Sequence, residues 1–139
     1  MAMDFYTRIF RAKNFIDNHY ATPIDLAKLS NEACFSKFHF LRLFKKTYRK
    51  TPYQYLTEIR LDKAKERLAK SNEGIADVCN AVGFESITSF TLKFKSYTGT
   101  PPALFRLRAL QRQKISREQP QRVIPHCFSF MFSAKESNS

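Results

Sequence analysis

This chain of 139 residues is poor in several residue types that particular functions require. It has only three glycines, and neither G-x-x-x-x-G-K-[ST] nor G-x-G-x-x-G occurs to hold a nucleotide. Its three cysteines form no C-x-x-C pair, and its three histidines show no regular ligand spacing. We therefore expect no metal, no cofactor and no disulfide framework. No cysteine or serine has a partner arrangement that indicates a nucleophile, so an enzyme is the least supported function.

Long apolar runs and acidic residues are also scarce. No apolar run approaches the ~18 residues of a membrane span. The first residues, Met-Ala-Met-Asp-Phe-Tyr, lack the basic and apolar regions of an export signal. We therefore expect a cytoplasmic protein without a membrane partner. The 12 acidic residues stand against 24 lysines and arginines, and the net charge of +12 favours a polyanionic partner.

What the chain does contain is a near-repeat. The segment 36–48, followed by Thr51-Pro52, reappears as 86–97, followed by Thr100-Pro101. Matching residues inside the segment differ in number by 50, as Phe40 and Phe90 or Phe44 and Phe94 do. On both sides the difference is 49, as for Phe35 with Phe84 and for Tyr48 with Tyr97. Each copy has the pattern of a helix, a tight turn and a second helix, the unit that presents a helix to the DNA major groove. Two copies predict two equivalent surfaces at a fixed separation.

The spacing of apolar residues predicts helices and no strand. A first helix is indicated by apolar residues three or four apart over positions 5–20, with Asp4 as its N-cap. In the motif Thr22-Pro23-Ile24-Asp25, we expect Thr22 to cap a second helix and Pro23 to take its first position. This second helix is predicted to end near Asn31.

A turn at 33–35 then leads to a third helix, capped by Ser36 and running to about Tyr48. Its inward face is predicted to consist of Phe40, Leu43, Phe44 and Thr47. Thr51-Pro52 starts a fourth helix that reaches about Lys70, with ~19 residues spanning ~28 Å. The buried side of this fourth helix is marked by Leu56, Ile59, Ala64 and Leu68.

The second unit repeats the arrangement. We expect a helix at 75–81, a turn centred on Gly83, and a helix at 86–97 that Gly99 ends in a left-handed conformation. Pro101-Pro102 opens a short last helix toward Arg108.

The predicted fold is therefore all-α, with about seven helices in two helix-turn-helix subdomains joined by a long linker helix. We assign 1–50 to the first subdomain, 51–71 to the linker helix and 72–107 to the second subdomain. Residues 108–139 form a basic tail that we expect to be disordered. The alternative is that this tail docks as a small extra element.

The segment 36–50 carries the strongest binding signal. It contains six basic residues and no acid, whereas a solvated helix face usually mixes both signs. The asymmetry favours contacts with phosphates and bases, and Arg42 can bond a guanine edge. Phe38 and Leu41 either touch thymine methyl groups and sugars or pack against a neighbouring helix. The DNA-binding residues that we expect here are Ser36, Lys37, Phe38, Leu41, Arg42, Lys45 and Lys46.

The corresponding helix of the second unit is chemically different. It has only two charged residues, and Leu92 stands at the position of Arg42. We therefore expect this unit to depend on backbone contacts, van der Waals contacts and DNA shape. Its expected DNA-binding residues are Ser86, Ile87, Thr88, Thr91, Leu92 and Lys95.

The motif residues resemble those of a known family. The first unit has Leu26-Ala27-x-Leu29, Phe35-Ser36 and Phe40-x-Arg42-x-Phe44-Lys45, and the more specific second unit has Ile75-Ala76-x-Val78, Gly83-Phe84-x-Ser86, Phe90 and Phe94-Lys95-x-Tyr97-x-Gly99-x-x-Pro102. Over roughly residues 5–106, this series resembles the DNA-binding domain of AraC/XylS-type transcription regulators. The chain departs from the family at Cys34, where a glycine is frequent, and at Leu92, where an arginine is frequent.

The resemblance implies seven helices and two recognition helices that enter successive major-groove segments on one face of the DNA. It also implies an activator of transcription that contacts RNA polymerase. Few residues precede the first helix, so the chain resembles the stand-alone subgroup, although a fragment separated from a sensor domain would look the same. Because one DNA turn is ~34 Å long, two heads on a ~28 Å helix suit binding as a monomer.

Two other classes of function stay open on the sequence. A basic helical protein that binds RNA or anionic surfaces would need exposed aromatic platforms, for which Phe38 is the one good candidate. A protein-interaction module would use Phe38, Leu41 and Leu92 as a partner patch.

Overall fold

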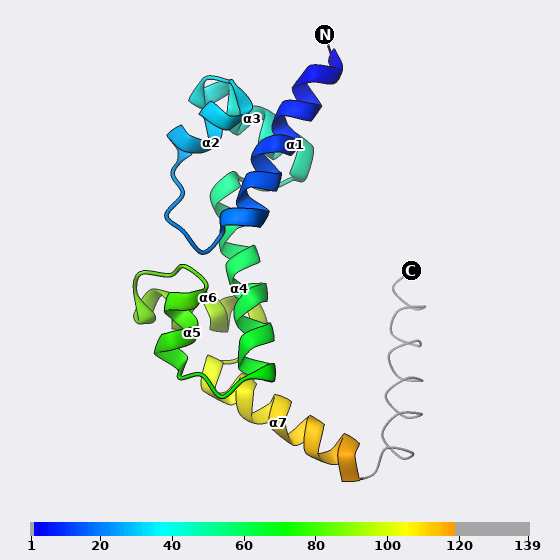
Figure 1. Ribbon diagram of the computed structural model, residues 1–139, viewed down its shortest axis with the longest axis vertical. Helices are drawn as coiled ribbons and strands as arrows, with labels where there is room; N and C mark the ends of the chain where they lie inside the picture. Colours follow the sequence, from blue (N-terminus) through cyan, green and yellow to red (C-terminus); the bar gives the residue numbers. More distant parts are fainter. Residues whose placement is uncertain (1, 119–139) are drawn as a thin grey trace.

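The computed structural model describes residues 2–118, and these form seven helices without a strand. The helices are α1 (Ala2–His19), α2 (Leu26–Ala33), α3 (Lys37–Tyr48), α4 (Pro52–Lys70), α5 (Ile75–Ala81), α6 (Ile87–Thr98) and α7 (Pro102–Glu118). The α2–α3 pair lies near one end of the long α4, and the α5–α6 pair lies beside its other half (Figure 1). The expected all-α fold with two helix-turn-helix units on a linker helix is confirmed.

The interior is divided into two hydrophobic cores, and α4 contributes to both. The first core joins α1, α2 and α3 with Leu56 of α4. The second core joins α5 and α6 with Leu61, Ala64 and Leu68 of α4. Because α4 serves two cores, one apolar stripe does not describe it. Ile59, which was predicted to lie on the buried side, is half-buried and belongs to neither core.

Local capping explains why α4 begins and ends where the sequence predicted. The Thr51 hydroxyl accepts a hydrogen bond from the Gln54 amide at 3.1 Å, and the Gln54 side chain accepts one from the Thr51 amide at 2.9 Å. Pro52 occupies the first helical position, where its missing N–H has no cost. The helix ends at Lys70, beyond which the Ser71 amide donates to the Arg67 carbonyl.

Four residues of the first unit do not have their predicted positions. Helix α1 begins at Ala2, so Asp4 lies in its first turn instead of capping it. Helix α2 is capped by Asp25, whose carboxylate accepts from the Lys28 amide, so neither Thr22 nor Pro23 has its expected position. A carboxylate caps a helix as well as a hydroxyl does, and here the N-cap is Asp25, the residue directly before the apolar run. Thr47 is exposed, and its hydroxyl donates to the Leu43 carbonyl within the helix.

Helix α7 is longer than predicted. It runs through Glu118 and does not end near Arg108, so the expected disorder of the tail is wrong for 108–118. Residues 109–118 contain no glycine or proline, and Gln113 donates a hydrogen bond to the Ala69 carbonyl at the end of α4. The rest of the predicted tail, 119–139, lies outside the described residues.

Candidate nucleic-acid interface

The two units have closely matching geometry around their second helices. Position by position, the sequence of buried, half-buried and exposed residues over 36–50 is the same as over 86–100. The ring centroids of Phe40 and Phe44 lie 5.7 Å apart at an interplanar angle of 57°, and those of Phe90 and Phe94 lie 5.7 Å apart at 56°. The sequence repeat is therefore a structural repeat, and the same positions of α3 and α6 face solvent.

The register of the repeat differs from the prediction on the downstream side. The shift stays at 50, because Arg49 and Gly99 both end their helices in the left-handed conformation, and Pro52 and Pro102 both begin the next helix. Tyr97 is therefore not the counterpart of Tyr48. The Tyr97 hydroxyl instead donates to Asp62 of α4 at 3.0 Å.

The tight turns that precede α3 and α6 also match. Cys34 has a φ of 58° and Gly83 has a φ of 101°, so both turns use a positive φ. The Cys34 amide donates to the Asn31 carbonyl at 3.0 Å, and the Gly83 amide donates to the Asn80 carbonyl at 3.2 Å. A side chain in this conformation has a steric cost, which Cys34 bears and Gly83 avoids.

The outward face of α3 presents cations that have no partner in the part of the chain that the structure describes. Ser36 caps the helix by accepting from the His39 amide. Among residues 2–118, no acidic side chain or carbonyl pairs with the side chains of Lys37, Arg42, Lys45 and Lys46, all of which are exposed. Because these cations have no such partner, their N–H groups stay available to a ligand.

Many other basic residues are occupied by the fold. Lys13, Lys50 and Arg67 form ion pairs with Asp17, Glu58 and Glu73. Three further arginines donate to backbone carbonyls, namely Arg8 to residues 33 and 34, Arg60 to residues 20 and 22, and Arg106 to residue 68. The free cations of α3 therefore differ from these cations, which have a structural role.

Two apolar residues flank Arg42 in different environments. The Phe38 side chain is 82% exposed. Leu41 is half-buried and lines a cavity of about 270 Å³ together with Leu26, Pro52 and Tyr53. Packing against neighbouring helices thus covers much more of Leu41 than of Phe38.

The outward face of α6 has the same shape and a different chemistry. Ser86 caps the helix, Ile87 and Thr88 are exposed, and Thr91 is half-buried like its counterpart Leu41. Leu92 is 65% exposed at the position of Arg42. Lys95 is exposed and has no ionic partner among residues 2–118, whereas Lys93 donates to the hydroxyl of Tyr53 at 3.2 Å.

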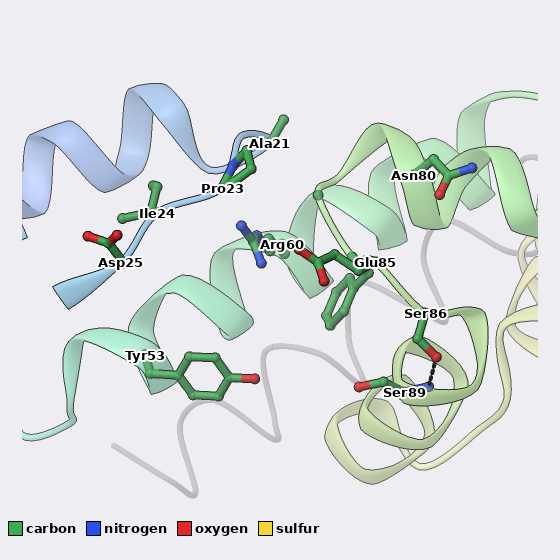
Figure 2. A pocket seen from close by; sticks show the side chains of 12 residues that line it. Ala21, Pro23, Ile24, Asp25, Tyr53, Arg60, Asn80, Glu85, Ser86 and Ser89 are labelled. Atoms are coloured by element: carbon green, nitrogen blue, oxygen red, sulfur yellow. Dashed lines mark hydrogen bonds between the residues drawn. The ribbon is translucent and has the colours of Figure 1, made fainter. Parts of the chain in front are cut away.

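Between the two units lies a cleft of about 560 Å³ (Figure 2). Its walls include the loop between α1 and α2, Tyr53 and Arg60 of α4, and Ser86 and Ser89 at the start of α6. Tyr53 is 61% exposed, and burial lowers the pKa of the Arg60 guanidinium. Sequence reasoning missed both residues, because the apolar spacing of α4 gives no sign of which polar residues face the gap.

No helix among residues 2–118 is long and apolar enough to cross a membrane. In the same part of the chain, no three His, Cys, Asp or Glu side chains gather where they could hold a metal ion. Cys34 is exposed and Cys79 is buried, and both are free thiols.

Residues 29–108 match the family model of a helix-turn-helix domain. The chain is 32% identical over 98 residues to the multiple antibiotic resistance protein MarA of Escherichia coli K12, covering 70% of this chain and 77% of MarA. It is 34% identical over 92 residues to YobQ of Bacillus subtilis 168, an uncharacterized HTH-type transcriptional regulator, covering 66% of this chain and 38% of YobQ. The chain thus spans well under half the length of YobQ.

The fold also occurs among solved structures. The DNA-binding domain of AdpA, a global transcriptional factor solved in complex with a target DNA, matches with a TM-score of 0.69. That match covers 81% of this chain and 96% of the AdpA domain at 23% sequence identity, so it shows a shared fold.

Proposed function

This chain belongs to the AraC-type helix-turn-helix family of DNA-binding transcription regulators, and from that premise we propose that it inserts α3 and α6 into two successive major-groove segments of one duplex. The observation that carries the proposal is the matched exposed face of the two helices, with cations on α3 that no other group of the described chain engages. A helix fits the width of the major groove, and free cations match the phosphates that line it.

In the first unit, the free cations have separate tasks. The Arg42 guanidinium reaches a guanine edge, where two parallel hydrogen bonds distinguish guanine from other bases. Lys37, Lys45 and Lys46 bind phosphates, which fixes the position of the helix without reading sequence. Phe38, which is largely exposed, contacts thymine methyl groups or sugars, and the exposed edge of Leu41 assists it.

In the second unit, Leu92 replaces the arginine, so van der Waals contacts carry more of the recognition. Ile87, Thr88 and Thr91 contribute apolar and hydroxyl contacts to base edges, and Lys95 binds a phosphate. Ser86 caps the helix N-terminus, whose free N–H groups favour an adjacent phosphate. The second unit therefore discriminates less strongly among bases than the first.

We further propose that the protein binds as a monomer, because one chain carries two heads. It acts in the cytoplasm on double-stranded DNA and has no catalytic activity of its own. Activation of transcription through contact with RNA polymerase is the mode that the family resemblance favours. Transcription from a promoter that carries the selected site, measured with and without the protein, separates activation from repression.

Competition binding tests the proposed function. A labelled duplex obtained by selection from a random pool is bound by the protein and then challenged with unlabelled selected or random duplex of equal length. We expect the random duplex to compete at least ~10³-fold less well, which is the lower end of specific recognition. Equal competition by both duplexes would instead assign the protein to non-specific binding of polyanions.

A further inference from the structure

The residues that hold the two units against each other lie at one place, where the turn before α6 meets the loop between α1 and α2. The Arg60 side chain of α4 crosses this gap. Its Nε donates to the Tyr20 carbonyl at 2.7 Å, and one terminal nitrogen donates to the Thr22 carbonyl at 3.0 Å. Arg60 sits between the loop residues and Glu85 in the cleft (Figure 2).

The backbone of the second unit closes against the same groups. A Cβ atom added to Gly83 would stand 2.8 Å from the Tyr20 carbonyl oxygen, 2.9 Å from the Arg60 Nε and 3.1 Å from the Ala21 Cα. Such distances leave no room for a side chain, so the turn of the second unit is in direct contact with the first. Gly83 therefore does more than supply a positive φ, which Cys34 supplies in the other turn without being a glycine.

Side-chain packing reinforces this contact. Tyr20 packs against both hydrophobic cores. Phe84, which follows Gly83, is buried in the second core, and the Arg60 guanidinium carbon lies 6.0 Å from its ring centroid. One arginine thus links three segments, namely the loop of the first unit, the linker helix and the turn that leads into α6.

From these contacts we infer that Arg60 and Gly83 are positioning residues that fix the distance and rotation between α3 and α6, and so determine which spacing between two DNA blocks the protein accepts. The inference rests on the proposed two-headed binding. Each unit packs its core onto its own part of the linker helix, and a second point of contact resists bending and twisting of that helix between them. One extra base pair moves a DNA block by ~3.4 Å and rotates it by about a tenth of a turn, so a locked pair of heads rejects it.

The test compares affinities for three duplexes that carry both blocks at the selected spacing, one base pair longer and one base pair shorter. For the wild type, we expect the selected spacing to be clearly preferred. Arg60→Met keeps an unbranched apolar stem against Phe84 and removes both hydrogen bonds. We expect it to reduce this preference by roughly threefold to tenfold, the effect of one or two hydrogen bonds. Arg60→Lys keeps the charge and can restore one bond, so its preference should be intermediate.

Two further measurements make the result specific to positioning. Arg67→Met on the same helix removes an ion pair with Glu73 away from the junction and should leave the spacing preference unchanged. Thermal unfolding of each variant shows whether it folds, and Gly83→Ala serves as a second variant that opens the same junction. If Arg60 only contacted a phosphate, Arg60→Met would lower all three affinities equally and Arg60→Lys would recover them.

The outcomes separate the two proposals. A wild type that prefers the selected spacing, with folded Arg60→Met and Gly83→Ala variants that keep the full preference, overturns the positioning role and leaves two-headed binding intact. A wild type that binds all three duplexes equally contradicts two-headed binding itself.

Discussion

At the level of single residues, the two units differ in the exposed position occupied by Arg42 in α3 and by Leu92 in α6. Both side chains are exposed on helices of matching geometry, so the difference lies in their chemistry. We expect Arg42→Ala to lower affinity for the selected site by ~1–3 kcal/mol and to relax base preference at one position. Binding titrations against duplexes that vary each base in turn measure both effects.

Lys45→Ala and Lys46→Ala are the matched controls for this prediction. Each should weaken binding to selected and scrambled duplexes alike and reduce the dependence of affinity on salt, because a phosphate contact carries no sequence information. If Arg42→Ala behaves in the same way as these two variants, Arg42 does not read a base.

Cys34 offers a test of backbone strain. Its φ of 58° carries a steric cost of about 1–2 kcal/mol for an L side chain. A glycine removes this cost, but its greater freedom stabilises the unfolded chain by about 0.4–1 kcal/mol. We therefore expect Cys34→Gly to raise the free energy of unfolding by ~0.5–1 kcal/mol in denaturant titrations. Cys34→Ala keeps the strain and should bring no gain. A Cys34→Gly variant less stable than the wild type would contradict the account of this turn.

At the scale of helices, a local cap or proline predicted the starts of α3 and α4 correctly, whereas Thr22-Pro23 stands before α2 without starting it. Thr51-Pro52 and Ser36 placed the starts of α4 and α3, because a hydroxyl cap and a proline act on the turn beside them. The end of α7 was missed because residues 109–118 offer no breaker, and its contact with Ala69 of α4 joins residues 44 positions apart. Tyr97 was wrongly matched with Tyr48 as its counterpart in the repeat for a similar reason, because its hydrogen-bond partner, Asp62, lies on another helix.

Phe94 anchors α6 in the second core. Its side chain is fully buried, so Phe94→Ala should lower the free energy of unfolding by ~3–5 kcal/mol through lost burial and a residual cavity. Phe38→Ala is the matched control, because the same truncation at an exposed site should change stability by less than ~0.5 kcal/mol. Chemical denaturation measures both variants. Similar stability losses would show that the buried and exposed faces are not as described.

The hydrogen bond between Tyr55 of α4 and Asp17 of α1 predicts a response to alkaline pH. Burial and this bond, 2.6 Å long, raise the pKa of Tyr55 to about 12 from an ordinary value of 10.0. The folded state therefore holds the phenolic proton after the unfolded state has lost it. The stabilisation is complete below pH 10 and is lost as pH rises toward 12.

We accordingly expect the free energy of unfolding to fall more gently between pH 10 and 12 in Tyr55→Phe than in the wild type. Below pH 10 the variant should be less stable, because its hydrogen bond to Asp17 is missing. Urea titrations across this pH range give both quantities. Parallel curves for the two proteins would rule out a contribution from the Tyr55 proton.

For the whole molecule, the sequence repeat predicted two heads but not how they are held. The repeat follows from residues whose spacing is visible in the chain, such as Phe40 with Phe90 and Phe44 with Phe94. The junction depends on Arg60 meeting the Tyr20 carbonyl 40 positions away, a contact set by how the helices pack together. Periodicity identifies the face that each helix buries and carries no information on which polar side chain reaches a distant backbone.

The most direct test of the account is the insertion of five base pairs between the two contacted blocks of a selected duplex. Because a DNA turn contains ~10 base pairs, this insertion moves one block to the opposite face of the duplex, where α6 cannot reach it while α3 stays bound. We predict that affinity falls toward that of a duplex carrying the first block alone, and that an insertion of ten base pairs does not restore it, since the linker helix is of fixed length. Affinity unchanged by the five-base-pair insertion would contradict a protein that reads DNA with two fixed heads.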